Sequence, residues 1–398
     1  MSIDDDVGVH GKSVGVVETK RFSFGEPPGE MLLECGQKLG PVTLAYETCG
    51  ELSAQRDNAV LVMHALSGDA HVAGYHSESE RKPGWWDLMV GPEKPIDTGT
   101  YFVICANVIG GCKGSTGPGS ENPKTGRPYG LEFPMVTVSD MVDAQVRLLD
   151  HLGVERVLTA IGGSMGGMAV LELAVGHPEW VASIIPVATS ARLNAMSIAF
   201  NEVGRQAIMK DPAWCGGQYY GTAGPTGGLS IARMIGHITY LSEPSMREKF
   251  GRRLQEKEVY GYDFSTEFQV ESYLRYQGDA FIKRFDANSY LYITKAMDYF
   301  DVAEKYGGGS LVGAFERIRP ETRVLVISFT SDWLFPTAQS KEIVKALKAN
   351  GLPTSFLEVE SRYGHDAFLL PNEQQETAIR GFLRSVLGHV WGRGSAGK

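Results

Sequence analysis

The feature that most constrains the fold is a strand-like run that meets a glycine cluster and continues as a helix-like run, over residues 157–174. Within it, Gly162-Gly-Ser164-Met-Gly166 fits the pattern G-x-S-x-G. A strand that turns at once into a helix holds the serine at its tip in a strained backbone conformation. Glycine suits the flanking positions because the turn is crowded there. The stretch predicts a nucleophile elbow with Ser164 above a sheet; the alternative is an ordinary glycine-rich turn with a solvated serine.

Length and charge restrict the classes of function. A chain of 398 residues, 43% apolar and 21% charged, can bury a sizeable core as one large or two ordinary domains. Its formal net charge of −9 argues against nucleic acid or an anionic membrane as a partner. We find no apolar run long enough to span a bilayer. The acidic start, Met1-Ser-Ile-Asp-Asp-Asp-Val7, lacks the basic and apolar regions of a signal peptide. We therefore expect a cytoplasmic protein.

The cysteines and histidines show no metal-binding spacing. An odd number of cysteines without a C-x-x-C pair predicts reduced thiols, as in the cytoplasm. His64, His71 and His76 come close together, but no cysteine or acidic neighbour completes a ligand set, so we expect no metal. The five cysteines are Cys35, Cys49, Cys105, Cys112 and Cys215.

The order of apolar segments predicts an α/β-hydrolase fold: a mostly parallel central sheet, helices on both faces and a helical lid insertion. Short β-type runs at 31–35 and 42–46 indicate a leading antiparallel hairpin, and Ser139 is expected to cap helix 140–152. A glycine-rich loop over 107–126 is long enough to be functional. The expected strands are 59–64, 101–106, 157–161, 181–188, 322–329 and 355–359, and the later core helices are 337–349 and 372–388. The expected division is 21–190 for the first part of the core, 191–312 for the lid and 313–390 for the second part of the core.

Two further side chains complete a candidate catalytic triad with Ser164. A serine hydroxyl needs a neighbouring base and an acid that orients the base, and in this fold class they follow the serine as Asp or Glu and then His. Asp332 follows strand 322–329, and His365 follows strand 355–359. Because parallel strands end at one edge of a sheet, these segments should converge. We expect His365 to act as the base and Asp332 to orient it.

Each of these residues also has a simpler interpretation. Asp332 could cap a loop, and His365 could be a core histidine. The competing acids Asp286, Asp298 and Asp301 fall in the helical block, and His177 and His237 do not follow a strand end in the required order.

An oxyanion hole requires two backbone N–H groups. One is expected from Met165, the residue after the nucleophile, and the other from Leu66, in the loop after strand 59–64.

Beyond the fold, the chain resembles the homoserine O-acetyltransferases of methionine biosynthesis, from near Phe22 to the last helix. The stretches that carry the resemblance are His64-Ala-Leu-Ser-Gly-Asp-Ala-His71, Asn107-Val-Ile-Gly-Gly-Cys-Lys-Gly-Ser-Thr-Gly-Pro118, Gly162-Gly-Ser-Met-Gly-Gly-Met168, Ala232-Arg-Met-Ile-Gly-His-Ile-Thr-Tyr240 and Tyr363-Gly-His-Asp-Ala-Phe-Leu369.

The resemblance implies ping-pong transfer of an acetyl group from acetyl-CoA, a co-substrate rather than a resident cofactor, to the homoserine hydroxyl. Ser164 would be acetylated, with His365 and Asp332 as above. Arg233 in the lid would bind the carboxylate of homoserine, and Asp366 its ammonium group; both assignments agree with charge. The family also implies a homodimer that pairs through the lid helices.

Several alternatives stay open at this stage. Relatives of this kind that use succinyl-CoA, or accept serine in place of homoserine, cannot be separated from one sequence. The same triad hydrolyses esters where water reaches the acyl-enzyme. A binding-only protein of this fold would lack a triad residue, and all three candidates are present here.

Overall fold

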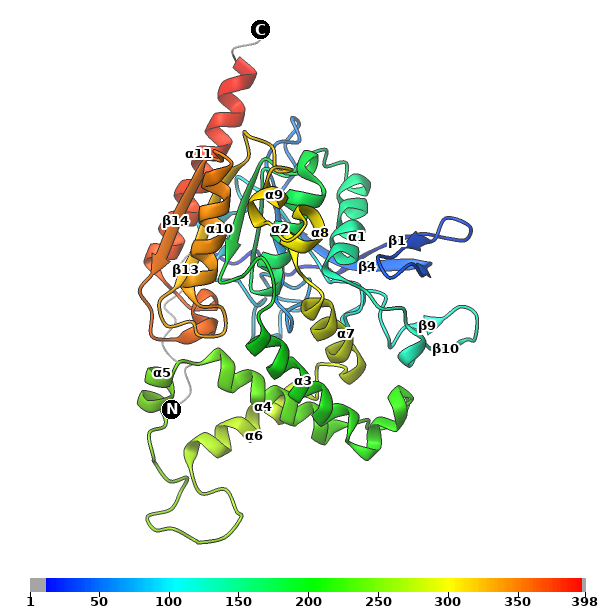
Figure 1. Ribbon diagram of the computed structural model, residues 1–398, viewed down its shortest axis with the longest axis vertical. Coiled ribbons are helices and arrows are strands. Elements are labelled where there is room, and N and C mark those ends of the chain that lie inside the picture. Colours follow the sequence, from blue (N-terminus) through cyan, green and yellow to red (C-terminus); the bar gives the residue numbers. More distant parts are fainter. Residues whose placement is uncertain (1–11, 396–398) are drawn as a thin grey trace.

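The computed structural model describes residues 12–395 and contains an eight-stranded sheet with strand order β1-β4-β8-β5-β11-β12-β13-β14 (Figure 1). The strands from β8 to β14 run parallel, whereas β4 is antiparallel to both β1 and β8. This confirms the mostly parallel sheet. The acidic stretch at residues 1–7 lies outside the described residues. The strands of the large sheet are β1 (Lys20–Phe24), β4 (Val42–Cys49), β5 (Ala59–Met63), β8 (Phe102–Ala106), β11 (Thr159–Gly163), β12 (Ser183–Val187), β13 (Arg323–Phe329) and β14 (Thr354–Val359).

The leading hairpin differs from the expectation. β4 pairs with β1, whereas residues 31–35 contribute only a short strand to a separate two-stranded sheet. The chain reverses in a turn after that strand, where the Gly36 N–H donates to the Leu33 carbonyl and Gly36 has φ of 82°, so the pairing of the strand stays local. The small sheets pair β2 (Met31–Leu32) with β3 (Lys38–Leu39), β6 (Val90–Gly91) with β7 (Ile96–Asp97), and β9 (Glu121–Asn122) with β10 (Arg127–Pro128).

Strand register brings the carboxyl ends of the parallel strands to one edge of the sheet. Gly163 at the end of β11 pairs with Val187 at the end of β12, and Val187 pairs with Ile327 of β13. The segments that follow these strands therefore leave the sheet together. Ser164 follows β11 and Asp332 follows β13, so both lie at this edge.

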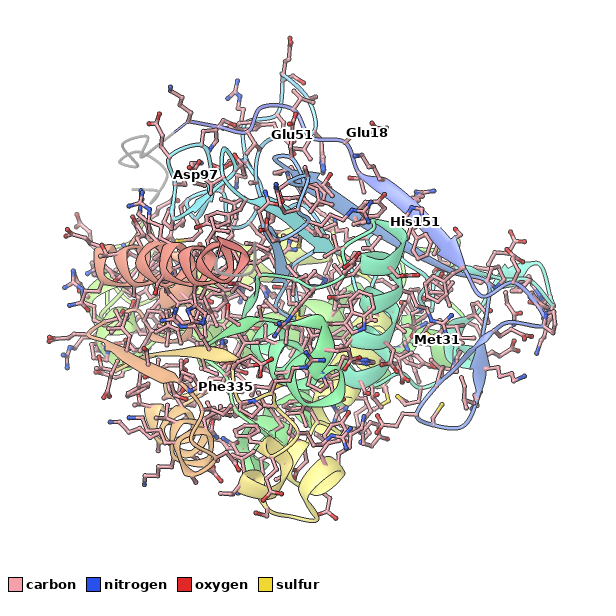
Figure 2. The ribbon with its side chains drawn as sticks, turned by 90° about the horizontal axis from the view of Figure 1, so that it is seen from above. Glu18, Met31, Glu51, Asp97, His151 and Phe335 are labelled. Carbon is pink, nitrogen blue, oxygen red and sulfur yellow. The ribbon has the colours of Figure 1, made fainter. Side chains whose placement is uncertain are left out.

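Helices cover both faces of the sheet, as predicted. Along β5, Leu61 and Met63 face an apolar layer formed with α1 (Val138–His151), α2 (Met165–Gly176) and α10 (Thr337–Ala349). Val60 and Val62 face the other layer, which includes α11 (Glu373–Ser395). Figure 2 shows α11 and α10 on opposite sides of β13 and β14. Alternation along the strand thus builds both layers of the core.

The start of α1 corrects one prediction. Its N-cap is Thr137, whose Oγ1 accepts a hydrogen bond from the Asp140 N–H, while Asp140 Oδ2 accepts one from the Thr137 N–H. The expected cap Ser139 lies inside the first turn, because the reciprocal capping box needs an acidic side chain three residues after the cap. Gly153, with φ of 70°, follows the helix end as expected.

A helical block separates β12 from β13. In Figure 1, α3, α4 and α6 lie together at the end of the molecule opposite the C-terminus, and α4 packs on both α3 and α6. The expected lid boundary at 312 falls inside α9, and the three-part division stays a prediction. Among residues 12–395, no helix is both long and apolar enough to cross a bilayer. The helices of the block are α3 (Ala195–Met209), α4 (Thr226–Tyr240), α5 (Glu243–Lys249), α6 (Gln269–Phe281), α7 (Ala287–Asp298), α8 (Val302–Gly307) and α9 (Leu311–Phe315).

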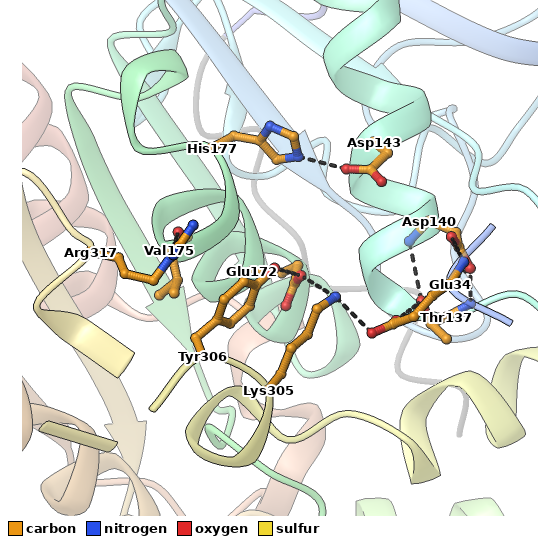
Figure 3. A network of polar contacts seen from close by, with 10 residues as sticks. All are labelled: Glu34, Thr137, Asp140, Asp143, Glu172, Val175, His177, Lys305, Tyr306 and Arg317. Carbon is orange, nitrogen blue, oxygen red and sulfur yellow. Dashed lines mark hydrogen bonds and ion pairs between the residues drawn. The ribbon is translucent and has the colours of Figure 1, made fainter. Parts of the chain in front are cut away.

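A buried carboxylate on α2 fixes this helix against its neighbours (Figure 3). Glu172 Oε1 accepts hydrogen bonds from the Tyr306 hydroxyl at 2.6 Å and from Lys305 Nζ at 3.1 Å, both on α8. Lys305 Nζ also lies 3.0 Å from Glu34 Oε1. A buried carboxylate with an ionic partner and a hydroxyl donor is a costly arrangement to disturb. The network therefore holds α2, and Ser164 at its N-terminus, in a fixed position.

Candidate active site

Ser164 sits at a sharp turn between β11 and α2, with φ of 59° and ψ of −124°. Glycine is required beside it: a Cβ on Gly166 would come 2.0 Å from the Met63 carbonyl oxygen, and one on Gly162 would come 2.6 Å from the Gly166 backbone. Because these are backbone atoms, no side-chain rotation relieves the clash. The G-x-S-x-G spacing therefore follows from the close approach of β5 to the start of α2.

The Ser164 side chain borders a small cavity of about 50 Å³. Ser164 as a whole is only 7% exposed to solvent. The backbone is pinned because the Ser164 N–H donates to the Val187 carbonyl at 3.0 Å and the Thr189 hydroxyl donates to the Ser164 carbonyl at 2.8 Å. The cavity is mostly apolar, and its other walls include Leu66, Leu193, Phe200, Tyr240, Tyr290, Leu334 and Phe335.

Asp332 and His365 are in direct contact. His365 Nδ1 lies 2.8 Å from Asp332 Oδ2, and both side chains are almost fully buried. The other carboxylate oxygen, Oδ1, accepts the Leu334 and Phe335 N–H groups at 3.0 and 2.9 Å. An acceptor at Nδ1 places the imidazole proton there and leaves Nε2 free to accept one.

Charge favours the protonated form of His365. Burial lowers the pKa of its imidazole, but the adjacent Asp332 carboxylate outweighs burial, and the pKa is raised above its ordinary value. The ring is held by aromatic neighbours, with centroids 5.1 Å from Phe335 and 6.1 Å from Tyr240. These contacts fix the orientation that the Asp332 hydrogen bond selects.

Ser164 and His365 border the same space. No hydrogen bond joins Ser164 Oγ to His365 within the described part of the chain. Tyr240 and Phe335 nevertheless line the Ser164 cavity and also flank the His365 ring. The structure thus joins the predicted acid and base directly and places the predicted nucleophile beside the same aromatic pair.

The two amides expected to form an oxyanion hole are both free of backbone partners. Met165 is the first residue of α2, and Leu66 lines the cavity with Ser164. Across residues 12–395, no hydrogen bond uses either N–H. An amide at a helix N-terminus also carries the positive end of the helix dipole. Both groups are therefore available to an oxygen that gains negative charge next to Ser164.

His64 holds the loop that carries Leu66. Its Nδ1 lies 2.8 Å from the Ala65 carbonyl, and its Nε2 accepts the Val108 N–H at 3.2 Å. This pair of contacts requires a neutral ring with the proton on Nδ1. Burial also lowers the pKa of His64. His64 is thus a structural residue that connects the loops after β5 and β8.

Arg233 and Asp366 bring opposite charges to the neighbourhood of His365. Asp366 follows His365 directly, in the short 3₁₀ helix η5 (Gly364–Leu369). Burial raises the pKa of Asp366 more than the charges of His365 and Arg233 lower it. The Arg233 guanidinium on α4 lies 5.5 Å from the Tyr240 ring, which also borders the Ser164 cavity. A guanidinium and a carboxyl group therefore lie near the residues that border the Ser164 cavity.

Sequence reasoning missed two residues of this group. Tyr240 lies seven residues after Arg233, two turns along α4, so helical spacing could have placed both on one face. Nothing in the sequence pointed to Lys249, whose pKa is lowered by burial and raised by the charge of Asp366, with burial the larger effect.

The residues that competed for catalytic roles have other partners. Asp286 and Asp301 cap α7 and α8, and Asp298 pairs with Arg205 at 2.7 Å. His177 contacts Asp143, and His237 contacts the Tyr273 hydroxyl.

An acidic partner for two of the clustered histidines is present, contrary to the sequence analysis. Glu47 on β4 accepts hydrogen bonds from His71 Nδ1 at 2.9 Å and His76 Nε2 at 2.8 Å. The Thr19 hydroxyl also donates to Glu47, at 2.7 Å. These donors could hold a cation, but they already satisfy one another. We therefore treat the cluster as a polar bridge between the N-terminal segment, β4 and the loop after β5.

The fold and the nucleophile elbow are those of the α/β hydrolases, and sequence comparison supports this class of protein. The sequence model of the α/β hydrolase fold family matches residues 58–371. The chain is 55% identical to the homoserine O-acetyltransferase of Desulfotalea psychrophila, over 94% of this chain and 96% of the relative. It is 57% identical to that of Solidesulfovibrio magneticus, with 95% of each chain covered. The chain therefore belongs to the homoserine O-acetyltransferase family within the α/β hydrolases.

Solved structures show the same fold in both transferases and hydrolases. The crystal structure of homoserine O-acetyltransferase from Bacillus anthracis superposes with a TM-score of 0.86 at 30% identity, covering 92% of this chain and 98% of that one. Esterase E22 superposes with a TM-score of 0.83 at 29% identity, covering 92% and 100%.

Proposed function

We propose that this chain transfers an acetyl group from acetyl-CoA to the hydroxyl of L-homoserine through an acetyl-Ser164 intermediate, in methionine biosynthesis. The observation that carries the mechanism is the buried His365–Asp332 pair beside the Ser164 cavity. It supplies a base whose Nε2 is free and whose protonated form is stabilised.

In the first half-reaction, His365 Nε2 takes the Ser164 hydroxyl proton while Oγ bonds to the thioester carbonyl carbon. The Leu66 and Met165 N–H groups stabilise the oxyanion that forms. When the C–S bond breaks, His365 returns the proton to the CoA sulfur.

In the second half-reaction, His365 accepts the homoserine hydroxyl proton as that oxygen attacks the acetyl carbon. The bond to Ser164 Oγ then breaks, and Ser164 recovers its proton from His365. Arg233 binds the homoserine carboxylate and Asp366 its ammonium group. His365 carries every proton in this cycle, so the cycle requires no resident cofactor.

The size of the cavity favours acetyl over succinyl as the acyl group. About 50 Å³ is open beside Ser164. A succinyl group would bring its free carboxylate against apolar walls that include Leu193 and Leu334, where an unpaired charge is costly. A kinetic matrix of acetyl- and succinyl-CoA against homoserine and serine tests both specificities, and preference for succinyl-CoA or serine contradicts the proposal.

Hydrolysis is the second candidate, because esterase E22 shares the fold over nearly the whole chain. The discriminating experiment measures thiol release from acetyl-CoA with and without homoserine. A transferase releases thiol in proportion to O-acetylhomoserine, whereas release that ignores homoserine indicates a hydrolase. Intact-protein mass spectrometry should show one acetyl adduct that Ser164→Ala abolishes, and an adduct that persists in this variant would remove Ser164 from the mechanism.

We also propose a homodimer that pairs through the lid. Supporting this, large apolar side chains are exposed on the packed helices α3, α4 and α6. Ile231→Glu should reduce the mass measured by light scattering to that of one 43.4 kDa chain, while Leu32→Glu, at a more exposed apolar position on β2, should not. Unchanged mass for Ile231→Glu contradicts the assigned surface. The exposed side chains are Met196 at 58%, Val203 at 54%, Ile231 at 50%, Ile238 at 44% and Tyr276 at 65%.

The site of action that we propose is the cytoplasm. All five cysteines are free thiols, which supports a reducing compartment.

A further inference from the structure

The hydroxyl of Tyr290 on α7 has no hydrogen-bond partner in the protein, although Tyr290 lies on the wall of the Ser164 cavity. Across residues 12–395, no hydrogen bond uses Tyr290 Oη. The residue is buried, with 7% of its surface exposed. Its hydroxyl is nevertheless not one of the fully enclosed side-chain atoms of the described chain that lack a partner. The accessible surface of the hydroxyl therefore opens into the cavity that Tyr290 lines.

Three other polar side chains on this wall are satisfied by the protein itself. Ser197 Oγ donates to the Leu334 carbonyl at 3.5 Å, and Thr239 Oγ1 donates at 2.8 Å to the backbone carbonyl three residues before it. Asn201 Nδ2 donates to Asp298 Oδ1 at 2.9 Å. A donor left free in a mostly apolar cavity costs free energy unless a ligand accepts its hydrogen bond. The tyrosine hydroxyl is therefore placed for a ligand.

The packing of the helical block keeps room for this hydroxyl. α7 packs on α3, and α3 packs on α4. On α3, a Cβ at Gly204 would come 2.7 Å from Tyr290 Oη and 3.4 Å from the Ala232 Cβ on α4. A larger residue at position 204 would therefore press on the hydroxyl and on the residue that directly precedes Arg233. The missing side chain at Gly204 leaves the space that the hydroxyl occupies.

The charges near Tyr290 indicate which substrate group its hydroxyl faces. Burial raises the pKa of this hydroxyl, and the nearby charges of Arg233 and Arg205 oppose the rise. The phenol is therefore neutral and keeps its proton as a hydrogen-bond donor. Arg205 is already paired with Asp298 at 2.7 Å, whereas no ion pair within residues 12–395 uses Arg233. The cation that is left for a ligand beside Tyr290 is thus the one assigned to the acceptor carboxylate.

We propose that Tyr290 is a second ligand of the acceptor carboxylate: its hydroxyl donates a hydrogen bond to one carboxylate oxygen, and Arg233 binds the other. This inference rests on the proposed function, because it assumes homoserine as the acceptor. The guanidinium supplies charge, and the hydroxyl, fixed between α3 and α4, supplies direction. Together they hold the acceptor with its own hydroxyl toward the acyl group on Ser164. Water has no carboxylate and gains nothing from this pair.

The variant Tyr290→Phe removes only the hydroxyl and tests this assignment directly. We expect KM for homoserine to rise by about tenfold or more, because a hydrogen bond to a charged group is lost. KM for acetyl-CoA and kcat should change by less than about twofold. Tyr299→Phe, at an exposed tyrosine that directly follows α7, is the matched control and should leave all three values unchanged. A rise in KM for acetyl-CoA alone, or no change in KM for homoserine, would overturn the proposal.

Thermal unfolding without substrates separates a binding role from a structural one. Because the Tyr290 hydroxyl has no partner in the protein, Tyr290→Phe should have the melting temperature of the parent or a higher one. Tyr292→Phe on the same helix removes a hydrogen bond to the Phe133 carbonyl, at 2.5 Å, and should have a lower melting temperature. An equal decrease for both variants would show that the Tyr290 hydroxyl is structural and would contradict the proposal.

A variant on α3 reaches the same hydroxyl from outside. Gly204→Ala places a Cβ against Tyr290 Oη, so it should raise KM for homoserine by displacing the hydroxyl. In Tyr290→Phe the atom that clashes is absent. The double variant should therefore have about the KM of Tyr290→Phe alone, which supports the proposal, whereas effects that multiply would contradict it.

Failure of the proposed function is distinguishable from failure of this inference. In the first case, the parent enzyme transfers no acetyl group to homoserine. In the second case, the parent enzyme transfers acetyl to homoserine, and Tyr290→Phe has the same KM for homoserine as the parent.

Discussion

His365 Nδ1 lies 2.8 Å from Asp332 Oδ2, inside a region where both side chains are 4% or less exposed. The two residues come from the loops after neighbouring parallel strands, β13 and β14. Because the second oxygen of Asp332 is held by two backbone N–H groups, the carboxylate cannot turn away from the ring. The pair sets both the tautomer and the proton affinity of the imidazole.

Replacing Asp332 by Asn should lower kcat by about 10³–10⁴-fold with little change in fold. The amide has nearly the same shape, but it presents no negative charge to His365 and can select the wrong tautomer. Steady-state kinetics at saturating substrates measure the effect. A loss of less than tenfold would show that His365 does not depend on this carboxylate.

The pH profile gives a second test of the same pair. The base must be neutral to accept the Ser164 proton, so kcat/KM should rise with pH through the His365 pKa. Burial lowers that pKa but Asp332 raises it to above the ordinary 6.5, so the rise in the parent enzyme should be centred above 6.5. In Asp332→Asn the rise should move to lower pH, and an unmoved profile would assign it to another group.

Ser164→Gly should make the protein more stable while it abolishes transfer. A serine at φ of 59° carries strain that glycine does not. The strain relieved is about 1–3 kcal/mol, reduced by the greater chain entropy of glycine in the unfolded state. Ser164→Ala is the matched control, because it also removes the hydroxyl but keeps Cβ. Thermal unfolding should give a higher melting temperature for Ser164→Gly than for Ser164→Ala. The reverse order would mean that the elbow stores no strain.

The sequence predicts that Ser164, Asp332 and His365 converge; the structure shows the contact between Asp332 and His365, and the role of all three as a triad stays a prediction. Each follows a predicted strand, and parallel strands end at a common edge of the sheet. Such an argument uses only local patterns and the topology of the fold class. It needs no knowledge of which side chains touch.

Contacts that depend on strand order or on loop packing could not be predicted in this way. Glu47 lies 24 residues before His71. Between them in the sequence lies β5, which does not pair with β4, because β8 lies between the two strands in the sheet. Ser67 and Arg284 are 217 positions apart and meet only when the helical block folds over the sheet. Neither pair leaves a periodic signal in the sequence.

Gly166→Ala should destabilise the protein strongly, by about 3 kcal/mol or more. Its Cβ would come 2.0 Å from the Met63 carbonyl oxygen, so β5 and α2 would have to separate. Gly381→Ala on α11 is the control, because its Cβ would meet nothing within 4 Å and alanine favours a helix by about 0.5–1 kcal/mol. Chemical denaturation should therefore show a lower free energy of unfolding than the parent for Gly166→Ala and a higher one for Gly381→Ala. Similar stabilities of the two variants would contradict the close approach of β5 and α2.

Glu47→Gln should lower the free energy of unfolding by about 1–3 kcal/mol near pH 6, and by less at pH 9. Burial raises the pKa of Glu47, but hydrogen bonds from His71, His76 and Thr19 outweigh it, so the pKa is lowered from 4.5. For His71, burial lowers the pKa, but Glu47 outweighs it, so the pKa is raised from 6.5.

Because the pKa of Glu47 is lowered, its ionised carboxylate stabilises the fold fully above about pH 4.5, and this stabilisation is lost as pH falls through the folded-state pKa. Because the pKa of His71 is raised, its protonated ring stabilises the fold fully below about pH 6.5, and this stabilisation is lost as pH rises through the folded-state pKa. Both contributions are present together only between these limits, so the difference between parent and variant should be largest there. The exposed Glu360→Gln is the control. Urea unfolding at several pH values measures the difference, and one that is independent of pH would show that Glu47 acts through shape alone.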